Sequence, residues 1–187
     1  MKFLNKYNNK KNIRYKSFEK TLKLSYERGL KTIVETGTAR GKTKFFFIKK
    51  YNWKDGMSTP MFAEYAKFTN AKLHTCDISA ENINKAKKFT IDYSDHIEFY
   101  IKDSLDFLKE FKCSIDLLYL DSLDGHDPIA ASNHQLLEAQ IAIEKLHDKS
   151  LILLDDKGSK TNLSINFLKE NSFKIIFETD YQVLLSK

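Results

Sequence analysis

Short apolar runs alternate with amphipathic stretches along the chain from residue 31 onward. The runs are nearly continuous in Ile, Val, Leu and Phe, which is typical of strands that are buried on both faces. Strands of this kind, separated by segments long enough for a helix, indicate a parallel sheet flanked by helices. The sequence therefore predicts an α/β fold, with parallel strands at residues 32–36, 72–77, 96–101, 115–121 and 150–155.

The C-terminal segment departs from this alternation. Two apolar runs, at residues 173–177 and 181–185, are separated by only three residues, which is too few for a helix. Strands joined by such a short connection must pair antiparallel. We therefore expect a mostly parallel sheet that ends in an antiparallel hairpin, unlike an ordinary dinucleotide-binding domain, where a further crossover helix would follow.

An amphipathic helix is predicted before the first strand, because Phe18, Leu22, Tyr26 and Leu30 recur every four residues and Ser17 can serve as its N-cap. The surrounding residues, 1–28, also hold nine Lys or Arg against two Glu. Such a basic arm could contact RNA, an anionic glycan or an acidic partner. No motif of a known nucleic-acid-binding module accompanies it, so a solvated surface is the favoured interpretation.

Length and composition predict one domain. The chain has 187 residues, of which 42% are hydrophobic, enough for a substantial core. No repeat or Pro/Gly-rich linker appears, so we divide the chain into the basic arm with its helix, residues 1–29, and one domain, residues 30–187.

No apolar run is long enough to span a membrane and the first residues are too polar for a secretory signal, so we expect a cytoplasmic protein. Cys76 and Cys113 lie apart without metal-site spacing, and we expect both to be buried thiols.

A glycine-containing turn follows the first strand. Gly37 and Gly41 let the backbone turn sharply and approach a ligand without an intervening side chain. Two kinds of site share this pattern, since residues 37–43 come within one residue of a phosphate-binding P-loop. The missing residue shortens the ring of backbone N–H groups that must surround a phosphate. The turn alone leaves both interpretations open.

The end of the second strand favours a Rossmann-like site. Asp77 stands where such a site needs an acid to accept hydrogen bonds from ribose hydroxyls. It lies well beyond the usual gap of about 20 residues from the turn. A second helix start at Gly56 explains the distance, because Ser58 or Thr59 can cap a helix there and Pro60 suits its first turn. We therefore expect residues 42–55 to be an insertion between the turn and a delayed helix that ends near residue 70.

These motifs, namely residues 33–41, Asp77, residues 102–104 and residues 116–121, resemble the ordered motifs of class I S-adenosylmethionine-dependent methyltransferases. The resemblance covers about residues 30–187. It is strongest to the small "methyltransferase domain 24" group and to the metal-assisted O-methyltransferases. It implies a Rossmann-like, doubly wound, mostly parallel seven-stranded sheet with helices on both faces.

The resemblance also implies roles for residues of the cofactor site. The methionine part would be held by the turn, the carboxylate by the delayed helix, the ribose by the acid after the second strand, and the adenine by the residues after the third. In that order these residues are Glu35, Gly37, Thr38 and Gly41, then Ser58, then Asp77, then Asp103 and Ser104. For Asp103 and Ser104, a helix cap is an equally good interpretation, and both roles can hold together.

Methyl transfer to a hydroxyl needs an aligned acceptor and a group that removes its proton. The segment after the fourth strand contains Asp121 and His126, and His126 is the first candidate for the general base. Asp121, Asp155 and Asp156 could converge on a divalent cation such as Mg²⁺, which prefers oxygen ligands and would acidify a bound hydroxyl. Alternatively, Asp155 and Asp156 form a polar strand end or a helix cap.

The acceptor expected from these features is a hydroxyl on a small molecule or a sugar. The Asn/Asp-Pro-Pro-aromatic segment that accompanies amino methylation of nucleic-acid bases is absent after the fourth strand, so a nucleic-acid acceptor is not favoured. No membrane association is expected, and a homodimer is left open. Two other classes also stay open: a P-loop-like nucleotide-binding protein, and a cofactor-binding module without catalysis.

Overall fold

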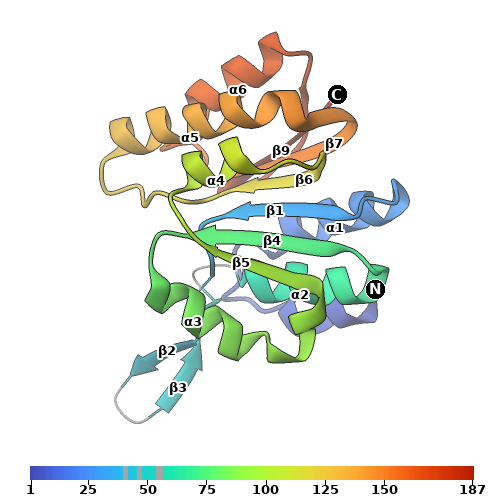
Figure 1. Ribbon diagram of the computed structural model, residues 1–187, viewed down its shortest axis with the longest axis vertical. Helices are drawn as coiled ribbons and strands as arrows, with labels where there is room; N and C mark the ends of the chain where they lie inside the picture. The colour runs from blue at the N-terminus through green and yellow to red at the C-terminus, as the bar shows by residue number, and fades with distance from the viewer. Residues whose placement is uncertain (40–41, 46–47, 54–56) are drawn as a thin grey trace.

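A computed structural model describes residues 1–39, 42–45, 48–53 and 57–187. Its central feature is a seven-stranded sheet in the order β5-β4-β1-β6-β7-β9-β8 (Figure 1). Neighbouring strands from β5 to β7 pair parallel, whereas β9 pairs antiparallel with both β7 and β8. The α/β class and the C-terminal antiparallel hairpin are therefore confirmed. The seven strands are β1 (Thr32–Thr36), β4 (Lys72–Asp77), β5 (Ile97–Ile101), β6 (Ile115–Leu120), β7 (Leu146–Asp155), β8 (Lys174–Glu178) and β9 (Gln182–Ser186).

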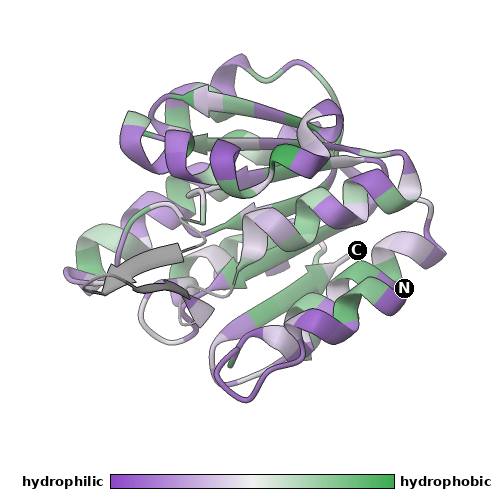
Figure 2. Cartoon of the chain, turned by 90° about the horizontal axis from the view of Figure 1, so that it is seen from below, coloured by the Kyte–Doolittle hydropathy of each residue, from purple (hydrophilic) through white to green (hydrophobic). Residues whose placement is uncertain are grey.

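Helices cover both faces of this sheet, as expected (Figure 1). Successive residues of a strand point to opposite faces, so Ile33 packs in the cluster under α1 and α2, and Val34 in the cluster under α4, α5 and α6. This alternation explains why the strands read as continuous apolar runs. Figure 2 shows hydrophobic residues gathered on the strands and hydrophilic residues on the outer helices. The helices are α1 (Tyr15–Glu27), α2 (Ser58–Thr69), α3 (Ala80–Phe89), α4 (Ser104–Glu110), α5 (Pro128–Ala142) and α6 (Thr161–Glu170).

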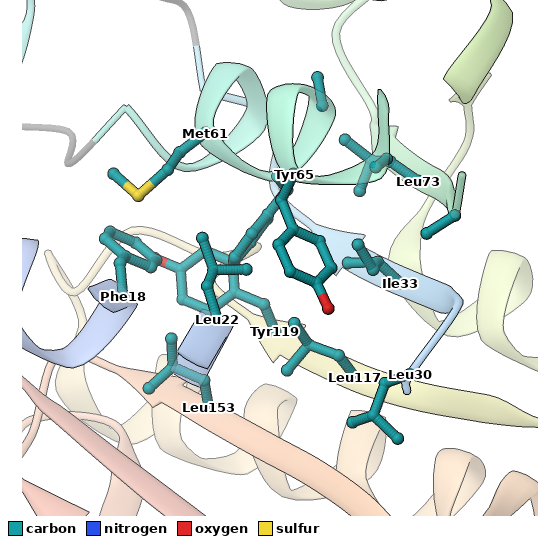
Figure 3. Packing of buried hydrophobic residues seen from close by; sticks show 14 of the residues in the cluster. Phe18, Leu22, Leu30, Ile33, Met61, Tyr65, Leu73, Leu117, Tyr119 and Leu153 are labelled. Carbon is teal, nitrogen blue, oxygen red and sulfur yellow. The ribbon is translucent and has the colours of Figure 1, made fainter. Parts of the chain in front are cut away.

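The N-terminal arm packs against the sheet. A 3-10 helix, η1 (Lys2–Tyr7), and α1 contribute Leu4, Tyr7, Phe18 and Leu22 to the same buried cluster as strand residues. In Figure 3, Phe18 and Leu22 lie beside Tyr119 of β6. The rings of Phe18 and Tyr119 meet edge to face, with centroids 5.4 Å apart. The arm therefore shares one core with the rest of the chain, while its lysines face outward.

Two details of the predicted first helix are wrong. The helix begins at Tyr15 with Arg14 in the N-cap position, and Ser17 lies inside it. Tyr26, expected in the core, is 56% exposed, whereas Ser25 is buried. The reason is geometric, because residues spaced strictly by four drift around a helix by about 40° at each step. The buried stripe instead follows mixed spacings of three and four.

The predicted insertion forms a hairpin. Strands β2 (Lys42–Phe45) and β3 (Ile48–Tyr51) pair antiparallel in a sheet of their own between β1 and α2. Helix α2 then begins at Ser58, so the delayed helix start is confirmed. Its predicted cap is wrong, because the N-cap position is Met57, which has a left-handed backbone with φ 57° and makes no side-chain cap bond. Trp53, after the hairpin, packs half-buried against the core.

Of the two cysteines, Cys76 is buried as predicted, but Cys113 is exposed. Cys113 lies between α4 and β6, where the chain crosses the surface before it enters the sheet. Among the described residues, no helix is long and apolar enough to cross a membrane.

Candidate functional site

The carboxyl ends of the parallel strands meet at one edge of the sheet, and the order of strands reverses at β1. Strand β1 pairs with β4 on one side and with β6 on the other, so the chain winds in opposite directions from it. In open α/β sheets, ligands bind in the crevice at such a switch point. The polar residues that the sequence analysis placed at strand ends, Asp77, Asp121 and Asp155, all lie at this edge.

The turn after β1 passes tightly between the two neighbouring strands. The Gly37 N–H donates to the Cys76 carbonyl at 2.9 Å, and the Asp121 N–H donates to the Thr36 carbonyl at 3.0 Å. Gly37 has φ +84°, and a Cβ atom there would lie 2.1 Å from the Asp121 carbonyl oxygen. No other residue type fits this position, because it combines a left-handed backbone with direct backbone contact.

Glu35 lies beneath this turn with its side chain fully buried. Its Oε2 accepts hydrogen bonds from the hydroxyls of Thr75, at 2.7 Å, and Thr59, at 2.8 Å. The Thr59 hydroxyl oxygen also accepts the Ala39 N–H at 2.7 Å. One carboxylate thus joins β1, β4 and the first turn of α2, and it fixes the turn through Thr59. Thr59 was expected to cap α2, so its actual role is a correction.

Burial raises the pKa of Glu35 to about 7, although hydrogen bonds from the hydroxyls of Ser58, Thr75 and Thr59 oppose the shift. The nearby Asp77 carboxylate adds to the increase. Within the described part of the chain, the hydrogen-bond donors to the Glu35 side chain are neutral hydroxyls, which compensate only part of the penalty for ionising a buried carboxylate. The charge of Glu35 therefore changes near neutral pH.

Asp77 ends β4 and lies half-buried in the cleft wall. Its Oδ1 accepts the Ser79 N–H at 2.8 Å, and its Oδ2 accepts the Asn82 amide at 3.1 Å. A longer bond of 3.4 Å comes from the Thr38 N–H. Asn82 was missed by the sequence analysis. The signal for it was its place in the first turn of the helix that follows the acid.

The cleft at this edge has a volume of about 580 Å³. A smaller hollow of about 120 Å³ adjoins it and shares Gly37, Asp77 and Ile78 with it. The cleft brings together most of the predicted site residues, namely Gly37, Thr38, Ser58, Asp77, Asp121, His126, Asp155 and Asp156. The smaller hollow holds Asp103 and Ser104. Gly41, predicted at the turn, lies outside the described residues.

Asp103 and Ser104 have structural partners as well as a place in the hollow. Asp103 is the N-cap of α4, and its Oδ1 accepts the Leu105 N–H at 2.9 Å. The Ser104 hydroxyl lies 2.9 Å from Nε2 of His134 on α5. The cap interpretation is therefore correct for Asp103, and it is compatible with ligand contact because both residues line the hollow.

His126 lies in the loop between β6 and α5 and is exposed at the cleft wall. The loop is held by Asp127, the N-cap of α5, whose Oδ1 accepts the N–H groups of Ile129 and Ala130, both at 3.1 Å. No hydrogen bond joins the imidazole to any described residue. The ring is therefore available to a ligand in the cleft.

Asp121, Asp155 and Asp156 offer carboxylate oxygens within 4.8 Å of one another. Two cations lie among them. Arg14 donates from Nε to Asp155 at 2.6 Å and from Nη2 to Asp156 at 2.8 Å. The Lys160 ammonium contacts Asp156 at 2.9 Å and Asp121 at 3.2 Å. One oxygen of each of the three carboxylates therefore accepts a hydrogen bond from a positive group, whereas Asp155 Oδ2 is buried with no hydrogen-bond partner among the described residues.

Both cations in the cluster were missed. Arg14 belongs to the basic arm that the sequence analysis assigned to a solvated surface, and Lys160 precedes α6. Burial lowers the pKa of each, but the carboxylates outweigh this effect, so both stay charged. Conversely, burial and the Asp155 carboxylate raise the pKa of Asp121 well above its ordinary value.

Comparison with known proteins adds three findings about the family and the fold. A family model described as a methyltransferase domain matches residues 53–157. Among solved structures, the chain is similar to a methyltransferase from Podospora anserina bound to SAH, with TM-score 0.65, 13% identity and coverage of 91% of this chain and 77% of that chain. No curated protein matches the chain significantly in sequence.

Two further solved structures share the fold. One is a putative O-methyltransferase from Klebsiella pneumoniae, with TM-score 0.63, 16% identity and coverage of 91% of this chain and 79% of that chain. The other is a putative rRNA methylase from Clostridium thermocellum, with TM-score 0.59, 16% identity and coverage of 94% and 97%. The P-loop alternative is not favoured, because Lys42 and Thr43 begin strand β2 instead of the helix that a P-loop requires.

The raised pKa of Glu35 predicts a pH-dependent stability. The folded protein binds this proton up to pH about 7 and the unfolded chain only up to about 4.5, so stability from Glu35 is complete below 4.5 and is lost as pH rises through 7. The free energy of urea unfolding of the wild type, minus that of Glu35→Gln, should fall by up to about 3 kcal/mol over this range. A difference that stays constant between these pH values would contradict the assignment.

Proposed function

Because the chain belongs to the methyltransferase-domain family, we propose that it transfers a methyl group from S-adenosylmethionine to a hydroxyl of a small molecule or sugar. One observation carries the proposal: a single cleft contains the turn at Gly37, the acid Asp77 and the free imidazole of His126. The first two suit an amino-acid-like nucleoside cofactor, and the third suits proton removal. Without His126, the cleft would support cofactor binding alone.

The cofactor occupies the side of the cleft formed by β1, β4 and α2. Its methionine part lies along the turn at Gly37 and Thr38, which Glu35 supports from below. The start of α2 at Ser58 faces the same space, and the unpaired N–H groups of a helix N-terminus favour a carboxylate. This placement explains how an insertion between the turn and the helix is compatible with one binding site.

The nucleoside part extends from the cleft into the smaller hollow. Asp77 belongs to both spaces, so it can accept hydrogen bonds from the ribose hydroxyls. Asn82 holds the Asp77 carboxylate in place through its amide. The adenine then lies near Asp103 and Ser104.

The charge of the cleft favours a small acceptor without phosphate groups. Its described lining residues include six carboxylates and one cation, Arg14, which is already paired with two of the acids. Such a lining attracts the positive sulfonium of the cofactor and repels a polyanion. A nucleic-acid acceptor is therefore disfavoured at the site of transfer, and a neutral hydroxyl compound fits better.

His126 removes the proton from the acceptor hydroxyl. In-line methyl transfer mainly requires alignment of acceptor and donor, and a hydroxyl becomes a much better nucleophile as its proton leaves. Asp121 is less free to act alone, since its carboxylate contacts Lys160 at 3.2 Å and the Tyr119 hydroxyl at 3.2 Å. We assign Asp121 the task of shaping the cleft between His126 and the cofactor turn.

Calorimetric titration with S-adenosylhomocysteine tests the cofactor site. The wild type should bind it and should not bind ATP, and Asp77→Ala should weaken binding by about 10- to 100-fold, because a charged hydrogen-bond acceptor is lost. Asp92→Ala, which removes an exposed acid outside the cleft, is the matched control and should bind as the wild type does. The proposal would be refuted if the Asp77 and Asp92 variants bound S-adenosylhomocysteine with equal affinity, or if the wild type bound ATP and not S-adenosylhomocysteine.

Transfer of labelled methyl groups to a panel of sugars, phenols and amines tests the acceptor chemistry. With an accepted hydroxyl compound, His126→Ala should lower kcat by about 100-fold or more with a smaller change in KM, because a general base is lost. His147→Ala is the control, since His147 binds Asp116 near the opposite edge of the sheet and should leave kcat unchanged. If amines alone are methylated, or if kcat survives in His126→Ala, the hydroxyl mechanism is wrong.

A further inference from the structure

The carboxylates at the ends of β6 and β7 and two cations form one alternating row of charges. The Arg14 guanidinium bridges Asp155 and Asp156, at 2.6 and 2.8 Å. The Lys160 ammonium then bridges Asp156 and Asp121, at 2.9 and 3.2 Å. Each cation therefore contacts two acids, and the central acid, Asp156, contacts both cations. The row lies in the wall of the cleft, on the side away from Asp77.

Arg14 is held firmly in this wall by its own helix and by neighbouring side chains. It occupies the N-cap position of α1, where its carbonyl oxygen accepts the Ser17 hydroxyl at 2.9 Å. Its guanidinium lies over the ring of Tyr181, 6.0 Å from the centroid, and its side chain is only 11% exposed. Helix α1 is anchored in the core through Phe18 and Leu22. The guanidinium is thus presented by a rigid element.

Lys160 is equally enclosed, with a side chain that is 3% exposed. It occupies the N-cap position of α6, and Asp155 opposite is 1% exposed. Charges buried to this extent stay in place only when they are paired, because removal of one partner leaves the other desolvated without compensation. The two cations and the three acids therefore stabilise one another as a unit.

A divalent ion would compete directly with these cations. Mg²⁺ and related ions need carboxylate oxygens as ligands at close to 2 Å. One oxygen of each of the three carboxylates already accepts a hydrogen bond from Arg14 or Lys160, and Asp155 Oδ2 is left without a hydrogen-bond partner in the described part of the chain. An ion among them would lie within a few ångströms of two positive groups in a partly buried site, where repulsion is strong. Entry of the ion would require at least one of these two side chains to leave.

We propose that Arg14 and Lys160 are the resident cations of this cluster, that they hold the place a divalent ion would need, and that the site therefore works without metal. Arg14 is accordingly a positioning residue: it fixes Asp155, Asp156 and the N-terminal helix as one wall of the acceptor side of the cleft. The claim that methyl transfer needs no metal rests on the proposed function. The claim that the cluster excludes a metal ion rests only on the contacts within the cluster.

Electron paramagnetic resonance of free Mn²⁺ measures the exclusion directly on the full chain. The wild type should bind no Mn²⁺ up to millimolar concentration, and EDTA should leave its melting temperature unchanged. The variant Arg14→Gln/Lys160→Met should bind Mn²⁺ at least about tenfold more tightly. Addition of Asp156→Asn to that variant should remove the new binding, because a ligand is lost. Lys157→Met, which removes a neighbouring lysine that pairs with Glu178, is the control and should behave as the wild type does.

Two results would overturn the proposal. One is Mn²⁺ binding by the wild type that Asp156→Asn abolishes. The other is a variant that unfolds cooperatively on heating, and is therefore folded, yet gains no affinity for Mn²⁺. If the double variant does not fold, Lys160→Met alone serves, since it leaves the Arg14 contacts in place. Binding of S-adenosylhomocysteine in the same samples reports separately on the proposed function.

Discussion

The buried carboxylate of Glu35 holds the cleft together, because the chain between the glycine turn and its helix is interrupted by a hairpin. In an uninterrupted unit the turn leads directly into the helix, and their relative position is set by the backbone. Here the strands β2 and β3 intervene, and the contact between the two parts is made by side chains. Thr59 on α2 donates to Glu35 and accepts from Ala39 of the turn. A polar network in the interior is stabilising only when its donors and acceptors are satisfied, so each of these hydroxyls matters.

The opposite wall of the cleft depends on a different kind of interaction. There, buried and half-buried charges of opposite sign pair in a row that begins with Arg14, at the start of the N-terminal helix, and ends with Asp121, directly after β6. Such pairs are costly to bury, and their value is geometric, since each charge must stay where its partner is. The ion pairs of Arg14 attach the N-terminal helix to the wall of the cleft. The same helix shares a core with β6 and β7 through Phe18 and Tyr119. A hydrogen-bond network around Glu35 thus supports one side of the cleft, and a row of ion pairs supports the other.

The sequence was informative where structure is local and failed where contacts are distant. Strand positions could be predicted because burial on both faces leaves continuous apolar runs, and the hairpin of β8 and β9 because three residues cannot hold a helix. The shared location of the acids at strand ends could also be predicted, because the carboxyl ends of parallel strands meet at one edge of a sheet. The role of Thr59 was missed because the hairpin separates it along the chain from its partner, Glu35. Arg14 was missed because its partner lies 141 residues away along the chain, and no local pattern distinguishes it from the exposed lysines around it.

The central claim is that two segments, separated by a hairpin and joined by Glu35, form one cofactor site. A crystal structure of the chain with S-adenosylhomocysteine tests it most directly. The account predicts that the amino-acid part lies between Gly37 and the start of α2 at Ser58, and that the ribose hydroxyls lie within hydrogen-bond distance of Asp77. A ligand that contacts the turn but not α2, or whose ribose lies away from Asp77, would contradict the account.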